Sequence, residues 1–354
     1  MRPVRDPRLR VMSDEPFNAE TPLDEQVGTI TPNELHYVRN HSGVPRWDGL
    51  AVDGAVERPL ALGLDDLTAM TTRSLVVTLE CAGNGRAFLD PPVPGEQWRL
   101  GAVGTAEWTG VPLRDVLDRA RLAARAVEVV FAGADVAEAK GPNPRANGAA
   151  AGPERWRRIA FERSLPVARA LDADVLLAFA MNGEPLPADH GAPLRLVVPG
   201  AYGVASVKWL ARITAVDRPF RGFYQAERYV IEGEPLPPIA PRAVITFPRE
   251  GAILGGGPVV ISGYCWSAAP VAAVEVSTDG GATWSGAEID AAVSPHAWRR
   301  WRFPWMPTGP GDATLIARAV TGSGERQPLS PVRSALGYAN NAAQAVNVRV
   351  GAAT

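Results

Sequence analysis

The stretch Val76-Val77-Thr78-Leu79-Glu80-Cys81-Ala82-Gly83-Asn84-Gly85-Arg86 decides how the rest of the chain is interpreted. Its first half has the apolar and β-branched residues of a buried strand. Its second half has the small residues and Asn that tolerate a tight or left-handed backbone. A lone cysteine is more often an inert core residue than a reactive one. Here, however, we expect the Cys81 thiol at a strand end, facing a cleft, with the charge of Arg86 favouring its thiolate.

The sequence around Cys81 and three other segments resemble one known family. Residues 79–86 resemble the molybdenum-ligand motif of the sulfite oxidase family of molybdopterin enzymes. The other segments follow in the family's order: Tyr37-Val38-Arg39-Asn40-His41, Asp189-His190-Gly191-Ala192-Pro193-Leu194-Arg195 and Val207-Lys208-Trp209-Leu210. The resemblance implies an α+β fold, in which a mixed α/β molybdopterin-binding domain precedes an immunoglobulin-like β-sandwich domain. It also implies a molybdenum cofactor carried on molybdopterin.

Length and composition favour a two-domain globular protein. The chain has 354 residues, which is too long for one ordinary core. Its formal net charge of −2 gives no general attraction to nucleic acid or to an anionic membrane, so we expect neither as a partner. Cys81 and Cys265 lie in different predicted domains, which argues against a disulfide and leaves Cys265 as a small core residue.

The N-terminus carries no pattern of an export signal. Residues 1–10 are basic, but no apolar stretch follows them. No run along the sequence approaches the length of a membrane span. We therefore expect a cytoplasmic protein, and a periplasmic location stays open if the chain is a processed form.

Changes in composition divide the chain into three parts. Residues 1–27 lack apolar periodicity and predict an extended arm that wraps a domain or stays loose. Residues 28–234 form the predicted catalytic domain, and a Pro-rich linker follows at 235–241. The remainder, 235–354, has short alternating strands about ten residues apart, which predict a β-sandwich. Its segment 274–284 resembles the family's dimerisation domain, so a homodimer through this domain is expected.

Several elements of the catalytic domain can be placed from their patterns. Apolar spacing of 3–4 residues predicts a helix over 110–120, and the Gly-, Pro- and Asn-rich segment 137–153 predicts a surface loop, with a lid over the cleft as the alternative. The other expected elements are strands at 47–56, 128–131 and 175–183 and helical segments beginning near 64 and 164.

The second half of this domain contains a group of cationic and basic side chains. His190, Arg195 and Lys208 look like donors for a phosphate, which favours bidentate Arg and the point charge of Lys. The pterin cofactor carries a phosphate or nucleotide tail, so this interpretation agrees with the resemblance. The residues that the family match assigns to cofactor binding are Tyr37, Asn40, His41, Asp135, His190, Arg195, Ser206 and Lys208.

The resemblance also implies the reacting group and its neighbours. Cys81 would be the metal ligand, because molybdenum accepts soft sulfur. Arg39 and Arg86 would bind an oxyanion, and Trp98 would form a wall of the substrate pocket. Tyr229 would reach the metal-bound oxygen, with Tyr224 as its rival for that position.

The implied reaction is a two-electron oxygen-atom transfer, most simply the addition of an oxygen atom to sulfite, which is thereby oxidised to sulfate. No Cys-x-x-Cys-His haem motif is present in the sequence, so electrons would leave to an external acceptor, with a cytochrome among the candidates. Another oxyanion, a sulfoxide or an organic molecule is the alternative substrate. A non-catalytic cofactor-binding protein is the alternative of a different class, and the retained Cys81, Arg39, Arg86 and Tyr229 argue against it.

The sequence departs from the family pattern at four positions. Gly85 and Ala345 stand where relatives carry Arg, Ala192 replaces a bulky aromatic residue and Ser206 replaces His. Each lost arginine contact to an oxyanion would cost about 1.5–3 kcal/mol of binding. We therefore expect a small dianion to bind less well here, unless another group compensates.

Overall fold

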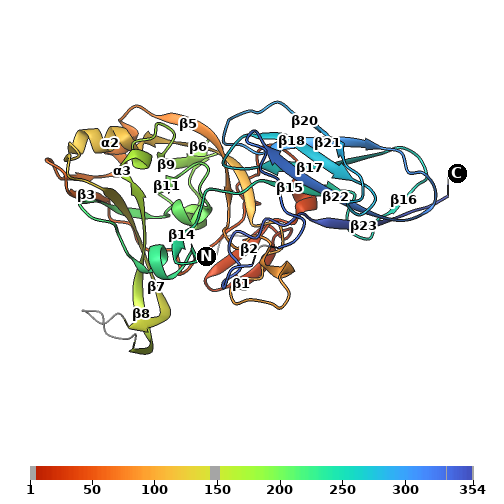
Figure 1. Ribbon diagram of the computed structural model, residues 1–354. Helices are drawn as coiled ribbons and strands as arrows, with labels where there is room; N and C mark the ends of the chain where they lie inside the picture. The colour runs from red at the N-terminus through yellow and green to blue at the C-terminus, as the bar shows by residue number, and fades with distance from the viewer. Residues whose placement is uncertain (1–4, 144–151, 332, 353–354) are drawn as a thin grey trace.

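The chain folds into two lobes that lie side by side (Figure 1). The computed structural model describes residues 5–143, 152–331 and 333–352. One lobe holds the strands up to β14, and the other begins at β15 and ends at the C-terminus. The largest hydrophobic core runs from one lobe into the other, because it joins first-lobe residues such as Leu113 to Trp266 and Trp298 of the second.

The first sheet of the catalytic lobe places Cys81. Its order is β10-β9-β6-β5, with β11 beside β9. β5 pairs antiparallel with β6 along its whole length, from Arg73 to Glu80, and Cys81 follows directly. The predicted strand at this position is therefore present, and the buried Val77 and Leu79 fix its core-facing side. The strand bounds are β5 Arg73–Glu80, β6 Val103–Pro112, β9 Leu176–Met181, β10 Glu184–Pro185 and β11 Arg195–Val197.

The second sheet of this lobe carries the other walls of the site. Its order is β4-β3-β12-β7-β8, in which β12 runs parallel to β3 and antiparallel to β7. β7 and β8 form a long hairpin that projects from the lobe (Figure 1). The strand bounds are β3 Leu50–Gly54, β4 Leu60–Leu62, β7 Glu128–Asn143, β8 Gly152–Pro166 and β12 Leu210–Val216.

The described helices are few and short. The helix α2, Leu113–Ala120, is the one predicted from apolar spacing, and its Leu113, Val116, Leu117 and Ala120 are all buried as that spacing requires. The remaining helical segments are α1 Leu64–Thr68, α3 Val167–Ala170, the 3₁₀ turns η1 Leu23–Glu25, η2 Arg86–Phe88, η3 Ala188–His190 and η4 Gly203–Ala205, and the π turn η5 Phe223–Glu227.

The second lobe is the expected β-sandwich. One sheet has the order β15-β17-β21-β20 and the other β16-β23-β22-β18-β19, and apolar side chains from both fill the space between them. Cys265 lies in this core, and both cysteines are free, as expected. The bounds are β15 Arg242–Phe247, β16 Ile253–Leu254, β17 Val259–Trp266, β18 Val271–Ser277, β19 Ser285–Gly286, β20 Glu288–Ile289, β21 Arg299–Trp305, β22 Gly311–Thr321 and β23 Ala345–Val350.

The N-terminal segment differs from the expected extended arm. It contains a hairpin of β1, Arg10–Asp14, and β2, Phe17–Glu20. All four residues of β2 are buried, and a bridge from Ala19 to Val38 ties the hairpin to the catalytic lobe. The polar members of β2 are satisfied by backbone groups, since the amides of Asn40 and Arg99 donate to Asn18 and Glu20. Because these buried residues are polar, β2 lacks the apolar pattern by which a buried strand is predicted from sequence.

The expected loop over 137–153 is largely strand. β7 continues to Asn143 and β8 starts at Gly152, and residues 144–151 of the prediction lie outside the described residues. The pairing of Glu138 with Arg158 within the hairpin shows that backbone hydrogen bonds order a segment whose composition is typical of a loop. A two-stranded element, β13 Val230–Ile231 with β14 Glu234–Pro235, then leads to the linker.

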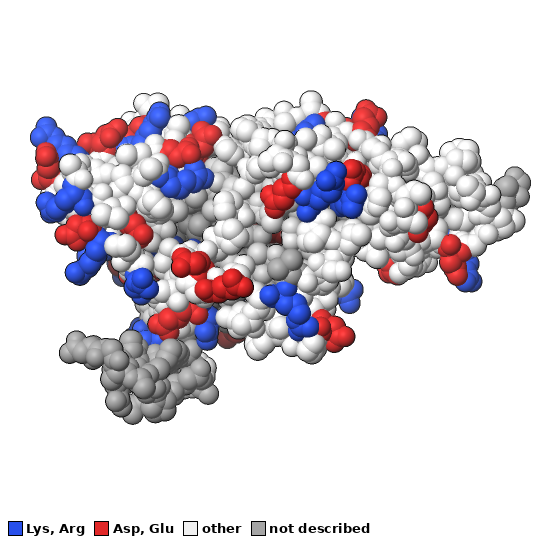
Figure 2. Space-filling view, viewed as in Figure 1, with Lys and Arg blue, Asp and Glu red and all other residues white. Residues whose placement is uncertain are grey.

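The surface has no large region of one charge on the face in view. Figure 2 shows Lys and Arg interspersed with Asp and Glu over both lobes, in agreement with the small net charge. Among the described residues, no helix has the length and apolar character that crossing a bilayer requires.

Candidate functional site

Two adjoining cavities meet at Cys81. Four residues line both of them: Arg39, His41, Cys81 and Tyr229. The predicted cofactor residues all line the inner cavity: Tyr37, Asn40, His41, Asp135, His190, Arg195, Ser206 and Lys208. Arg86 and Trp98 line the outer cavity, whose volume is about 370 Å³. The structure therefore brings together all the candidate catalytic and cofactor-binding residues.

The backbone around Cys81 forms a tight, hydrogen-bonded loop. The Cys81 amide donates to the Ala102 carbonyl at 2.8 Å, and the Asn84 amide donates to the Cys81 carbonyl at 2.9 Å. Gly85 has φ of 87°, a left-handed conformation that glycine adopts without strain. The turn predicted from these small residues is thus present, and it aims the Cys81 side chain at both cavities.

Burial controls the ionisation of Cys81. It raises the pKa of the thiol, and the charge of Arg39, followed by that of Arg86, lowers it only in part. The expectation that Arg86 favours a thiolate is therefore right in sign, but Arg39 has the larger effect and burial outweighs both. A thiolate at this position needs a stronger positive charge, which a coordinated metal ion supplies.

Arg86 is held in a fixed orientation at the outer cavity. Its Nε donates to the Leu336 carbonyl at 2.9 Å and its Nη1 to the Glu96 carbonyl at 2.7 Å. A Cβ at position 83 would lie 2.5 Å from Nη1, so only glycine there leaves room for this guanidinium. Trp98 is fully buried beside the cavity, and its Nε1 has no partner among the described residues.

An aromatic cluster forms the wall where the two cavities meet. The Tyr229 hydroxyl lies 2.8 Å from His41 Nε2, and burial lowers the pKa of this histidine, so the imidazole is neutral near pH 7. The Tyr229 ring stacks on Tyr338 with centroids 4.8 Å apart. Tyr224, the alternative to Tyr229 for the position next to the metal, lines the outer cavity but not the inner one.

Three cationic or basic side chains meet at the inner cavity. Arg195 donates to the carbonyls of His190, at 2.9 Å, and Ser206, at 3.2 Å. Lys208 Nζ donates to the carbonyls of Arg39 and Asp189 and to the Asn40 side chain. Burial, together with the charge of Arg195, lowers the pKa of Lys208 to about 7, and burial likewise lowers the pKa of His190. These partners are neutral groups, so no carboxylate of the described residues pairs with Arg195 or Lys208, and their positive charge can attract an anion.

Polar atoms at the inner cavity are left without partners in the described structure. Asp135 Oδ1 and His36 Nε2 are buried and unpaired. Burial raises the pKa of Asp135 to about 6 and lowers that of His36 to about 4. Unpaired buried groups of this kind are costly unless a ligand satisfies them. Their presence beside Arg195 and Lys208 fits an anionic, hydrogen-bonding cofactor such as a pterin with a phosphate.

The described residues offer a metal only one sulfur here. They contain no group of three or more His, Cys, Asp and Glu side chains placed to hold a metal ion. A metal at Cys81 would therefore take its other ligands from a non-protein group. The sulfur-bearing pterin expected from the sequence meets this requirement, so the residues present fit that cofactor.

Several residues of the site carry no signal in the sequence. Leu336 and Tyr338 of the second lobe line the outer cavity, and His36 lines the inner one. His36 directly precedes the matched motif at 37–41 and could have been included on that ground. Tyr338 lies more than 250 positions from Arg86, and only the folded chain places its ring 5.4 Å from that guanidinium.

Two of the departures from the family pattern lie away from the cavities. Ala345 is exposed in β23, and neither cavity includes it. Alanine at this position makes no contact with either cavity, and the expectation that the missing arginine weakens oxyanion binding stays a prediction. Ala192 also lines neither cavity, whereas Ser206 lines the inner one and accepts a hydrogen bond from the Val198 amide.

Two family models match the chain in the order expected. An oxidoreductase molybdopterin binding domain matches residues 41–224, and a Mo-co oxidoreductase dimerisation domain matches residues 239–351. The first match covers the loop after β5 and the residues of the inner cavity from His41 to Trp209.

Named relatives are similar over nearly the whole chain. Mitochondrial sulfite oxidase of Mus musculus is 38% identical over 98% of this chain and 67% of its own length. Sulfite oxidase of Arabidopsis thaliana is 31% identical over 99% of this chain and 96% of its own. Among solved structures, the sulfane dehydrogenase SoxCD of Paracoccus pantotrophus aligns with a TM-score of 0.78 and 30% identity, covering 94% of this chain and 84% of that one.

Proposed function

Since the chain belongs to the sulfite oxidase family of molybdopterin-dependent oxidoreductases, we propose that it oxidises a small sulfur oxyanion, with sulfite as the first candidate. Its cofactor is molybdenum on molybdopterin. When bound, this group supplies two-electron oxygen-atom transfer. The observation that carries the proposal is the position of Cys81 between a cavity lined by polar and cationic side chains and a second cavity lined by arginines.

The inner cavity supports the cofactor assignment. We assign the phosphate or nucleotide tail to Arg195, Lys208 and His190, because Arg195 and Lys208 provide positive charge that no described carboxylate pairs with and His190 lies beside them. Asp135 and His36 each have one unpaired buried atom that a pterin ring could satisfy. Tyr37, Asn40 and Ser206 complete the walls.

The outer cavity supports the assignment of an anionic substrate. Arg39 and Arg86 flank Cys81 there and would hold the oxyanion next to the metal. Burial raises the pKa of Tyr229 and keeps its hydroxyl protonated, so it would serve as a hydrogen-bond donor to a group held beside Cys81. Trp98 would limit the size of the bound group from one side.

The size of the outer cavity favours a second candidate within the same chemistry. A volume of about 370 Å³ is far more than a small oxyanion needs, since such an ion fills the space of a few water molecules of about 30 Å³ each. The aromatic rings of Tyr224 and Tyr338 also line it. A larger molecule that presents an oxidisable sulfur next to an anionic group would fit these walls.

A comparison of substrates in one assay separates the candidates. The molybdenum-loaded enzyme would be given sulfite, thiosulfate and an organic persulfide in turn, with ferricyanide as acceptor. Sulfite as the best substrate supports the first candidate, and a persulfide with a higher kcat/KM supports the second. Failure of all three with fully loaded enzyme would contradict both.

Variants of Arg39 test whether the substrate is anionic. Arg39→Gln removes a charge-assisted contact worth about 1.5–3 kcal/mol, so kcat/KM should fall roughly 10- to 150-fold. Arg39→Lys keeps the charge and should lose less. Arg46→Gln is the control, because Arg46 is 87% exposed at its side chain and lines neither cavity.

The partners are proposed from the domain composition. The dimerisation domain supports a homodimer, which light scattering of the purified chain would test. Electrons would pass to a separate protein, with a cytochrome as the first candidate, and stopped-flow reduction of an added cytochrome c would test this transfer. The expected cytoplasmic location stays a prediction that cell fractionation can check.

A further inference from the structure

A buried ion pair ties the end of β5 to the second lobe. Glu80 is the last residue of β5 and directly precedes Cys81, and Arg242 is the first residue of β15. Arg242 Nε lies 3.0 Å from Glu80 Oε1, as a charge contact without the alignment of a hydrogen bond. The two side chains are 1% and 2% exposed, so water does not screen the pair.

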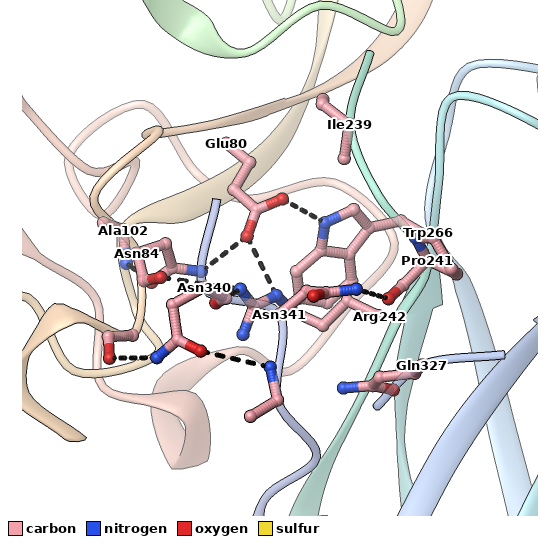
Figure 3. Close-up of polar contacts among 12 residues, drawn as sticks. Glu80, Asn84, Ala102, Ile239, Pro241, Arg242, Trp266, Gln327, Asn340 and Asn341 are labelled. Carbon is pink, nitrogen blue, oxygen red and sulfur yellow. Dashed lines mark hydrogen bonds and ion pairs between the residues drawn. The ribbon is translucent and has the colours of Figure 1, made fainter. Parts of the chain in front are cut away.

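Donors from both lobes complete the surroundings of the Glu80 carboxylate (Figure 3). Trp266 Nε1, from β17 of the second lobe, donates to Oε2 at 2.8 Å. Asn84 Nδ2, from the cysteine loop, donates to Oε1 at 3.0 Å. The carboxylate is therefore fully satisfied as an anion, and its partners come from the loop on one side and from the sandwich on the other.

A second set of contacts joins the same loop to residues 336–340. The Ala339 amide donates to the Ala82 carbonyl at 2.8 Å, and Asn340 Nδ2 donates to the Gly85 carbonyl at 2.8 Å. Arg242 Nη2 donates to the Asn340 carbonyl, which links this set to the ion pair (Figure 3). With the bond from Arg86 to Leu336, positions 80, 82, 85 and 86 around Cys81 all contact the second lobe.

We propose that Glu80 and Arg242 are positioning residues that lock the Cys81 loop onto the second lobe. The β-sandwich then has a role within its own chain, besides dimerisation: it fixes where the cysteine sulfur sits relative to the cofactor cavity. Buried ion pairs contribute little net stability compared with apolar contacts and serve best to fix one arrangement, which agrees with this role. The inference rests on the proposed function only in taking Cys81 as the metal ligand.

Hydrogen exchange of the purified full-length protein tests the lock directly. In Arg242→Met, amides of a peptide covering 81–89 should exchange at least about tenfold faster than in the wild type, because the loop opens locally. A peptide from β9 should keep its rate. Tyr264→Phe is the matched control: it removes a second-lobe hydroxyl that donates to the carbonyls of Gln26 and Gly28, a contact with the first lobe outside 81–89, and should leave 81–89 unchanged.

Kinetics of the same variants separate positioning from general stability. Arg242→Met should lower kcat by about tenfold or more with KM within about twofold, whereas Tyr264→Phe should change neither. Should Arg242→Met fail to fold, Arg242→Lys replaces it, since it keeps the charge but cannot reach both Glu80 and the Asn340 carbonyl. We expect a smaller effect in the same direction.

Each outcome of the exchange experiment either supports or overturns the positioning role of Glu80 and Arg242. Equal exchange at 81–89 in the Arg242 variants and Tyr264→Phe, or faster exchange of all peptides together, overturns the lock. Selective opening of 81–89 supports it even when the wild-type protein contains no molybdenum. An absence of molybdenum would instead overturn Cys81 as the ligand, so failure of the inference and failure of the proposed function are distinguishable.

Discussion

Two opposing influences act on Cys81 at the scale of the single residue. Its sequence neighbour Arg86 is visible in the motif, whereas Arg39 and the burial that raises the pKa of the thiol arise only on folding. Sequence reasoning could therefore name the residue and one charge near it, but not the balance between them. A metal ion is the group that would shift this balance to the thiolate.

Lys208 predicts how cofactor retention depends on pH. Burial lowers its pKa to about 7, so without a bound anion the ammonium loses its proton above that pH. An anionic tail favours the charged form, so binding is strongest below pH 7 and should weaken as the pH rises, by up to about tenfold per unit. Dialysis at pH 6 and pH 9, followed by pterin fluorimetry, should show greater loss at pH 9.

An arginine at position 208, which does not titrate between pH 6 and pH 9, provides the control for Lys208. Lys208→Arg keeps its charge across this range, so its retention should change less between pH 6 and pH 9. Lys208→Met should retain less cofactor at both values. Equal retention by the wild-type protein at pH 6 and pH 9 would contradict the assignment of Lys208 to an anionic group.

At the scale of elements, the loop after β5 depends on small residues for space. Gly83→Ala would put a Cβ 2.5 Å from Arg86 Nη1. The guanidinium can swing away, so stability should change little, by about 1 kcal/mol or less. Its contact with the anion would be lost, however, and KM for the anionic substrate should rise roughly tenfold.

Another glycine shows whether this effect is local. A Cβ on Gly43 would meet no atom within 4 Å, so Gly43→Ala should leave steady-state kinetics unchanged. Michaelis curves of the two variants with the same substrate make the comparison. The same KM in both would show that Arg86 does not contact the substrate.

Elements with a clear apolar pattern could be predicted from the sequence, and the others could not. The run of apolar and β-branched residues in β5 and the apolar face of α2 are local properties, and both were predicted. The hairpin β1–β2 was missed because Asn18 and Glu20 are buried polar residues whose partners are distant backbone amides. The hairpin β7–β8 was missed because its Gly, Pro and Asn content is typical of loops.

Sequence motifs predicted most of the candidate site, and the remaining residues are identified only by tertiary contacts. All the residues taken from the matched segments line the two cavities, but Tyr338 was missed because no local pattern connects it to Arg86. Ala345 is exposed in β23 and lines neither cavity, so the weaker oxyanion binding expected from its missing arginine stays a prediction. Contacts between lobes are the part of the site that a linear pattern cannot supply.

At the scale of the whole molecule, a second contact between the lobes predicts a pH effect on stability. Asp174 of the first lobe pairs with His296 of the second at 2.7 Å and with Arg73 at 2.7 Å. The hydrogen bond from His296 lowers the pKa of Asp174. Its stabilisation is therefore present above the ordinary value of about 3.9 and is lost as pH falls through the lowered pKa.

The variant Asp174→Asn should show this dependence. At pH 6 we expect the free energy of unfolding to fall by up to about 1 kcal/mol, since the groups are partly exposed. The difference from wild type should shrink below about pH 3.9, as urea titrations at several pH values would show. Asp48→Asn is the control, because its pair with Arg46 is mostly exposed and should contribute nothing measurable. A constant difference at every pH would contradict the account.

The account as a whole depends on a bond between Cys81 and molybdenum, and X-ray absorption at the molybdenum edge measures it. The wild-type enzyme and Cys81→Ser would be prepared from a host that makes the pterin. We predict that the variant keeps its fold and its pterin, loses one sulfur neighbour of the metal and loses turnover. An unchanged number of sulfur neighbours in Cys81→Ser, with turnover intact, would contradict the central claim.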